Sequence, residues 1–347
     1  MSKGGVLALN LKKGFYRRIK KRPIGFVRHG VQFAFLLFLL YVGLRFYQFV
    51  LHFASFGDTP FVERPDAVEG FLPISALVAL KVWITTGEFD SVHPAGLTLF
   101  AFIVGSGFIF RRFFCSWICP VGTVSEWIGI LGNKIFKKDI DLPKWVTGFL
   151  FPIKYILLAF FIFLIIVSMP VEAAKAFLLS PYNQISDVKM LQFFLDISQF
   201  TLIVLIILFF LSLLFRNFWC RFLCPYGAII GLGSLLGITR ISRNEESCTN
   251  CQQCTRVCPQ RIKVSEKKAV LTPECTACMQ CIEVCPHKDT LIVKTGPKRV
   301  KKWVLPVAFF SLFLIVVVSA KLTGHWETSL TYEDYEQLIP WGKYIGR

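Results

Sequence analysis

Residues 248–259 read CTNCQQCTRVCP, and residues 275–286 read CTACMQCIEVCP. Each stretch spaces four cysteines as C-x2-C-x2-C-x3-C and places a proline after the last one. Thiolate sulfur is the natural ligand of iron–sulfur clusters, and this spacing is typical of bacterial chains that hold two [4Fe–4S] clusters. The two stretches are nearly the same residue for residue, so they predict one compact unit with internal symmetry.

In this arrangement the fourth cysteine of each motif binds the cluster of the other motif. Cluster one is therefore expected on four thiolates: Cys248, Cys251, Cys254 and Cys285. Cluster two is expected on the other four: Cys275, Cys278, Cys281 and Cys258. Crossed ligation predicts an inserted α+β bacterial-type 2[4Fe–4S] ferredoxin domain at 240–298. Zinc is the alternative, since C-x2-C pairs also bind it, whereas disulfides are disfavoured in loops that face a reducing compartment.

The remaining four of the twelve cysteines form a second repeat. Residues 111–122 read RRFFCSWICPVG, and residues 216–227 read RNFWCRFLCPYG. Cysteines four residues apart share a helix face, and the following proline ends or bends that helix. A short helix is expected after each motif, at 121–135 and 226–238. Three interpretations stay open for the four thiols, which are a third metal or iron–sulfur centre, redox-active dithiols or buried small side chains: Cys115, Cys119, Cys220 and Cys224.

The composition places this chemistry at a membrane. Of the 347 residues 54% are hydrophobic, and the mean hydropathy is +0.57. About 20 apolar residues are needed to cross the hydrocarbon core of a bilayer. Five stretches meet this need: 30–51, 95–113, 147–169, 197–215 and 303–320. The expected fold is a membrane α-helical domain at 29–239 with four spans and the duplicated Cx3CP unit, followed by the ferredoxin domain and a fifth span at 299–320.

The formal charge of +17 lies mainly in loops that flank the expected spans. The positive-inside rule then places the basic segment 1–28 and the ferredoxin domain in the cytoplasm, and the tail 321–347 in the periplasm, of a multi-pass protein of the bacterial inner membrane. Basic residues spread along spans do not form a nucleic-acid surface. In the basic ferredoxin domain they favour contact with anionic membrane lipid, or with an acidic redox partner.

His93 is the candidate for proton exchange with a quinol, because Glu88 and Asp90 lie close to it in sequence and quinol oxidation needs a proton acceptor. The alternative is a b haem bound by two of the outer histidines, which include His52 and His325. There is no C-x-x-C-H motif for covalent haem attachment.

With both cysteine repeats and the stretch Glu69-Gly-Phe-Leu-Pro-Ile-Ser-Ala-Leu in place, the chain resembles the NapH/MauN/NosR-type polytopic membrane ferredoxins from about residue 60 to 290. The resemblance implies two [4Fe–4S] clusters, quinol oxidation and electron delivery toward periplasmic reductases. The expected function is electron transfer between the quinone pool and a partner reductase of anaerobic respiration, as a component of a quinol dehydrogenase. The partner is a periplasmic or cytoplasmic oxidoreductase. The rival is an assembly or maintenance factor that reduces a metal or thiol at the Cx3CP site.

Overall fold

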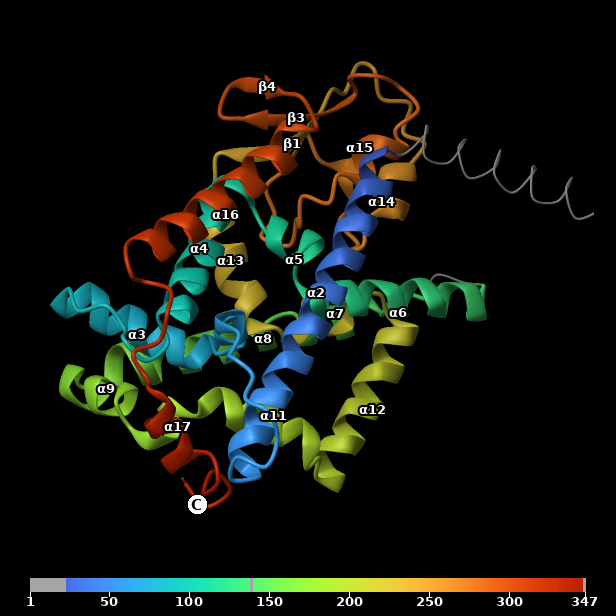
Figure 1. Ribbon diagram of the computed structural model, residues 1–347. Helices are drawn as coiled ribbons and strands as arrows, with labels where there is room; N and C mark the ends of the chain where they lie inside the picture. Colours follow the sequence, from blue (N-terminus) through green and yellow to red (C-terminus); the bar gives the residue numbers. More distant parts are fainter. Residues whose placement is uncertain (1–22, 138–139, 346–347) are drawn as a thin grey trace, which may run out of the picture.

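The computed structural model describes residues 23–137 and 140–345, in which a set of helices carries a small β-sheet at one end (Figure 1). Most of the basic segment predicted at 1–28 lies outside the described residues. The helix α17 and the C-terminal residues lie at the opposite end of the molecule from the sheet (Figure 1). The long helices run between these two ends, so the molecule has a ferredoxin end and a tail end.

Three helical runs are long and apolar enough to cross a membrane, and they coincide with the first, third and fifth predicted spans: α2 (Pro23–Ala54), Lys144–Ser168 and α16 (Val304–Leu322). The middle run is built from three segments: α7 (Lys144–Leu150), α8 (Ile153–Ile162) and the π-helical η2 (Phe163–Ser168). Large apolar side chains such as Leu44 and Phe163 point outward from these helices, as expected of surfaces that face lipid.

The other two predicted spans are shorter helices, so the count of five spans stays a prediction. The helix α4 (Pro94–Phe110) has 17 residues and ends where Arg111 takes a positive φ of 61°. The helix α12 (Gln199–Leu214) has 16 residues and meets α11 (Ser186–Leu195) at a bend of 80°. The bent pair becomes a fourth candidate span if its two helices cross the membrane together.

Short helices cover the tail end. Five of them are η1 (Asp66–Phe71), α3 (Pro73–Thr86), α9 (Val171–Leu178), α10 (Pro181–Gln184) and α17 (Tyr332–Leu338). The helix η1 contacts α2, whereas α3 packs against α9 and α4. Phe49 and Phe53 of α2 pack there against Tyr335 of α17. This contact ties the C-terminal tail to the far end of the first long helix.

Each Cx3CP motif forms a helix–break–helix unit, and the short helices predicted after the motifs are confirmed. The first unit comprises α5 (Phe113–Trp117) and α6 (Pro120–Phe136). The second comprises the π-helical η3 (Trp219–Leu223) and α13 (Pro225–Leu235). In both units the second cysteine is the N-cap and the proline takes the first helical position, where its missing N–H costs nothing.

The ferredoxin domain is a four-stranded antiparallel sheet with two short helices, in the strand order β2-β1-β3-β4. Its elements follow in chain order: β1 (Thr239–Arg243), α14 (Gln253–Val257), η4 (Val264–Glu266), β2 (Ala269–Val270), α15 (Gln280–Val284), β3 (Leu291–Thr295) and β4 (Lys298–Val300). The helices α14 and α15 occupy equivalent places in the two cysteine motifs and pack against each other. The α+β architecture expected for this domain is therefore present.

Buried charged groups hold the ferredoxin domain against the helices. Glu283 of α15 accepts hydrogen bonds from the backbone N–H groups of Ile24 and Gly25 in the first turn of α2, at 2.7 and 2.8 Å. A carboxylate at this position favourably meets the positive end of the helix dipole. Arg28, one turn further along, forms a bidentate pair with Glu126 of α6 at 2.7 and 2.6 Å. Gln280 then donates to the same carboxylate from the ferredoxin side.

We expect Glu126→Ala to destabilise the protein by about 3–5 kcal/mol, because it leaves the Arg28 guanidinium buried without its carboxylate. The matched control is Glu88→Ala. Glu88 pairs with Lys175 at nearly the same distance (2.7 Å) but is largely exposed, so we expect a loss of only about 0–1 kcal/mol. Chemical denaturation in mild detergent measures both changes. Equal losses in the two variants would contradict the role of the buried pair.

Candidate iron–sulfur and proton sites

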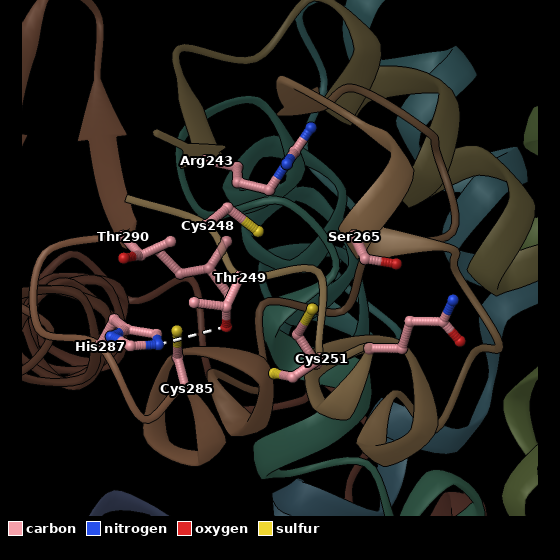
Figure 2. Close-up of a pocket in the computed structure, with 11 residues that line it drawn as sticks. Arg243, Cys248, Thr249, Cys251, Ser265, Cys285, His287 and Thr290 are labelled. Atoms are coloured by element: carbon pink, nitrogen blue, oxygen red, sulfur yellow. Dashed lines mark hydrogen bonds between the residues drawn. The ribbon is translucent and has the colours of Figure 1, made fainter. Parts of the chain in front are cut away.

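The four cysteines expected around cluster one line a single cavity, which we call the cluster-one cavity. It has about 350 Å³ of space, counting the part open to solvent, and Cys254 is among its lining residues. Cys248, Cys251 and Cys285 point into it (Figure 2). Thr249 and His287 lie at its rim, where the Thr249 hydroxyl is 3.2 Å from His287 Nε2 (Figure 2). Three cysteines thus come from one motif and one from the other.

The cluster-two cavity repeats this arrangement. Its volume is about 340 Å³ on the same measure, and four cysteines line it: Cys258, Cys275, Cys278 and Cys281. The structure therefore brings the eight thiols together in the two groups predicted from crossed ligation. Which atoms bind iron stays a prediction.

The backbone around these cavities fits an iron–sulfur cluster. Four residues at equivalent places in the two motifs take the left-handed conformation: Asn250, Gln252, Ala277 and Met279. Alternating right- and left-handed residues turn successive N–H groups toward one concave side, which favours an anion and recurs at iron–sulfur sites. Ala277 and Met279 adopt this conformation although a Cβ disfavours it. The two loops are thus folded for a bound negative group as well as for their thiols.

The two cavities differ in how far their cysteines are exposed to solvent. Cys251 is exposed at the cluster-one cavity, whereas every cysteine of the cluster-two cavity is buried. Burial raises the pKa of Cys258 to about 12, while the N–H of Asn250 and the Arg243 side chain lower the pKa of Cys248. Cys278 lies within electrostatic range of Arg28 and Glu126, so the cluster-two cavity faces the helices. The cluster-one cavity faces outward.

The four Cx3CP cysteines also come together. Cys119 interacts electrostatically with Cys115 and Cys224, and Cys220 with the other three. Burial raises the pKa of Cys119 to about 12, and burial also raises the pKa of Cys220 and Cys224. A nucleophilic dithiol needs a lowered pKa, because only the thiolate reacts. These thiols therefore suit a metal centre or simple packing better than thiol exchange.

The Cx3CP cysteines adjoin the cluster-two loop. The Ser116 hydroxyl, next to Cys115, donates to the carbonyl of Thr276, next to Cys275, at 2.7 Å. Glu274 on the same loop accepts from Arg112 and from Tyr155 at 2.9 and 3.0 Å, and pairs with Lys154 at 2.6 Å. Lys154 thus lies inside the run Lys144–Ser168 with its charge directed at the ferredoxin domain.

His93 lies at the tail end in a buried polar network. Most members of this network are distant from His93 in the sequence. Its Nε2 is 2.7 Å from the carbonyl of Asn183, and its Nδ1 faces Glu69 at 3.5 Å. Arg64 joins Glu69 to Asp187 through bonds of 2.7 to 2.9 Å. Asp90 is close enough to interact with His93, but Glu88 turns away to Lys175.

Sequence reasoning missed Glu69, Arg64 and Asp187 as members of this network. Glu69 and Arg64 had a signal, since charged residues in an apolar outer loop need partners. Asp187 lies 123 residues from Arg64 and had none. The other outer histidines lie outside this network. His52 contacts Thr59 and the distant Tyr332, and His325 lies beside Thr323.

The fold and these sites define a class of protein, a helical membrane protein with an attached iron–sulfur ferredoxin domain. Family models agree with this assignment. A model described as "4Fe-4S binding domain" matches residues 92–139 and 197–243, and each match contains one Cx3CP motif. A model described as "4Fe-4S dicluster domain" matches 240–286. No solved structure matches the chain significantly.

The chain belongs to the NapH/MauN/NosR-type family of membrane ferredoxins. It is 40% identical to YccM of Escherichia coli K12, a protein named for electron transport, over 92% of this chain and 91% of that protein. It is 29% identical to the methylamine utilization ferredoxin-type protein MauN of Methylorubrum extorquens, over 55% of this chain and 62% of MauN. It is 26% identical to the ferredoxin-type protein NapH of Escherichia coli K12, over 43% and 48%.

We expect Cys251→Ser and Cys281→Ser each to lose about four irons per chain, because each removes a ligand of one [4Fe–4S] cluster. Their effects on folding should differ. Cys251 is exposed, whereas Cys281 lies in the apolar core of the domain. Iron analysis with limited proteolysis separates the two effects, and only Cys281→Ser should make the ferredoxin domain sensitive to protease. Zinc in place of iron in the unmodified protein would refute both assignments.

The stability of the tail end should fall as the pH rises above neutrality. Burial alone lowers the pKa of His93, but the nearby Glu69 carboxylate outweighs burial and raises the pKa above its ordinary value. A raised folded-state pKa stabilises the protein below about pH 6.5, and this stability is lost as pH rises through the folded value. His93→Gln should flatten this slope in thermal unfolding, while His325→Gln should leave it unchanged. An unchanged slope in His93→Gln would rule His93 out as its source.

Proposed function

We propose that this protein moves electrons between the quinone pool and a partner oxidoreductase through two [4Fe–4S] clusters in its ferredoxin domain. The observation that carries the proposal is the pair of four-cysteine cavities, held against apolar helices by the buried ion pairs of Glu274 with Arg112 and Lys154. When bound, each cluster would accept and release single electrons. The protein's own residues fix where those clusters lie and what surrounds them.

The two cavities support different tasks. The cluster-one cavity reaches the surface at Cys251, so it is the side on which a soluble redox partner can approach. The cluster-two cavity is enclosed and faces Arg28 and Glu126 of the helical part, so it suits transfer within the molecule. Shared cysteine motifs keep the two sites adjacent.

We place the protein as a multi-pass protein of the bacterial inner membrane, with the ferredoxin end in the cytoplasm and the tail end in the periplasm. The positions of the two ends support this orientation, because the sheet and α17 lie at opposite ends of the long helices (Figure 1). The basic residues of the ferredoxin domain would then face the anionic inner leaflet or an acidic partner.

Proton exchange with a quinol is assigned to His93 and its carboxylate neighbours. The network supports this role because Glu69 raises the pKa of His93, which makes the ring a stronger proton acceptor. The 17 residues of α4 span about 26 Å between His93 and the turn at Arg111, at 1.5 Å per residue. Tyr226, two residues after Cys224, packs against Phe100 of α4, so the second Cx3CP motif lies closer to His93 than the end of α4 does. Electrons from a quinol at the tail end would have to pass along this part of α4 to reach the cysteines.

The second candidate function is reduction of a metal or thiol during assembly or maintenance of another enzyme. The bond between Ser116 and Thr276 favours it, because this contact places the Cx3CP cysteines beside the cluster-two loop. In that case the cysteines would be the site at which the metal or thiol is reduced, rather than an intermediate centre that passes electrons on.

A quinol titration separates the two functions. We expect a reduced quinol analogue to bleach the visible absorbance of the clusters in detergent-purified protein, and His93→Ala to slow this by about 100-fold, the usual size of a general-base contribution. His325→Ala is the control. If dithionite bleaches the clusters but the quinol does not, the quinol function fails. Loss of metal reduction in a Cys115→Ser, Cys220→Ser variant would then support the assembly factor.

A further inference from the structure

The two ring nitrogens of His93 have different surroundings, and these decide which nitrogen can exchange a proton. Nε2 lies 2.7 Å from the carbonyl oxygen of Asn183, and the Ser186 hydroxyl is further away at 3.2 Å. A carbonyl oxygen only accepts hydrogen bonds, so Nε2 carries a hydrogen in the neutral ring and in the charged ring. Nδ1 is buried with no hydrogen-bond partner among the described residues, and it faces the Glu69 carboxylate at 3.5 Å. Nδ1 is therefore the atom that gains and loses a proton.

Glu69 shares one face of η1 with a second carboxylate, Asp66. In a 3₁₀ helix, residues three apart lie one above the other. Both carboxylates meet Nη1 of Arg64, Glu69 at 2.9 Å and Asp66 at 3.9 Å. An arginine stays charged at every accessible pH, so Arg64 keeps its own protons. It therefore holds the two carboxylates near each other without taking part in proton exchange.

Exposure to solvent increases from His93 to Asp66. The side chains of His93 and Glu69 are 2% and 0% exposed, whereas the side chain of Asp66 is 25% exposed. The other two carboxylates within electrostatic range of His93, Asp187 and Asp90, are buried. Among these described carboxylates, Asp66 is the one that reaches solvent.

The C-terminal tail covers the residues before His93 and borders Asp66. Two hydrogen bonds of 2.7 and 2.9 Å attach it to the carbonyl groups of the two residues that precede His93: Thr328 to Val92 and Ser329 to Ser91. Lys321 and Glu327 lie within electrostatic range of Asp66. Asp66 thus lies at the edge of the buried network, between η1 and the tail.

The surroundings of Asp66 suit a group that takes up and releases protons. Burial raises the pKa of Asp66 to about 6, although the charge of Arg64 opposes this change. The nearby carboxylates of Glu69 and Glu327 also raise this pKa, and Lys321 lowers it. Proton exchange is most efficient when the pKa of the group lies close to the working pH. An ordinary aspartate would hold a proton too weakly for this task.

We infer that Asp66 releases into the solvent at the tail end the protons that His93 takes from a quinol. This inference deepens the proposed function and rests on it for the quinol. Oxidation of one quinol yields a quinone, two electrons and two protons. The electrons go to the iron–sulfur clusters. Each proton goes from a quinol hydroxyl to Nδ1 of His93, then to Glu69, through water to Asp66, and out to solvent.

The rate at which a reduced quinol analogue bleaches the clusters of the detergent-purified full chain tests Asp66. Asp66→Asn keeps the size of the side chain but removes its proton exchange. We expect it to slow bleaching by about 10-fold, less than His93→Ala, because water can partly replace a group at the surface. Asp66→Glu should restore most of the rate. Glu336→Gln, which changes an exposed carboxylate on α17, is the matched control.

The response to buffer separates proton exchange from a structural role. A small soluble buffer that titrates in the same range as Asp66, such as MES, can carry protons to and from a partly exposed site. At constant ionic strength, a higher concentration of MES should speed bleaching in Asp66→Asn and leave the wild-type rate nearly unchanged. Thermal unfolding checks that the variant is folded.

The outcomes distinguish this inference from the proposed function. Asp66→Asn at the wild-type rate, together with a slow His93→Ala, would overturn the release route and leave the proposed function standing. A slow Asp66→Asn that neither MES nor Asp66→Glu restores would give Asp66 a purely structural role and would also overturn the route. If dithionite bleaches the wild-type clusters but the quinol does not, the proposed function fails and the release route fails with it.

Discussion

One carboxylate, Glu274, connects the two halves of this protein. It precedes the first cysteine of the cluster-two motif and receives Arg112 from the turn after α4 together with Lys154 and Tyr155 from α8. Its partners are buried, so the contact fixes the ferredoxin domain in one orientation instead of tethering it loosely. The neighbouring contacts of Glu283 with α2 and of Arg28 with Glu126 depend on the same orientation. The ferredoxin domain becomes a fixed part of a membrane protein through these few groups.

The chemistry of the molecule is divided between its ends. Thiols and buried arginines gather at the ferredoxin end, whereas the tail end holds a histidine among carboxylates. The first set suits electrons and the second suits protons. Apolar helices separate the two ends. Electron transfer at one end can therefore be coupled to proton exchange at the other only through a molecule or centre that connects the two ends.

Local sequence patterns predicted much of the fold and of the candidate site. Cysteine spacing predicted which four thiols share each ferredoxin cavity, because crossed ligation is a property of the motif itself. The repeat of C-x3-C-P indicated that four further cysteines would meet. The short helices after both motifs followed from the proline at the first helical position.

Two features could not be predicted in this way. Hydropathy measures composition and does not register a helix end, so the turn at Arg111 and the bend before α12 shortened two expected spans. Proximity in sequence placed Glu88 beside His93, but the left-handed Gly87 precedes Glu88, which pairs with Lys175. Partners that are distant in sequence, such as Arg64 and Asp187, carry no pairing signal in a single chain.

The burial of the cluster-two cysteines has a consequence for how the protein is made. Cys258, Cys275, Cys278 and Cys281 are all enclosed between the ferredoxin core and the helices in the finished fold. Docking leaves these thiols little contact with solvent, so we expect iron and sulfide to reach them before the domain docks. We therefore expect an order in biogenesis, in which the ferredoxin segment is loaded before Glu274 pairs with Arg112 and Lys154.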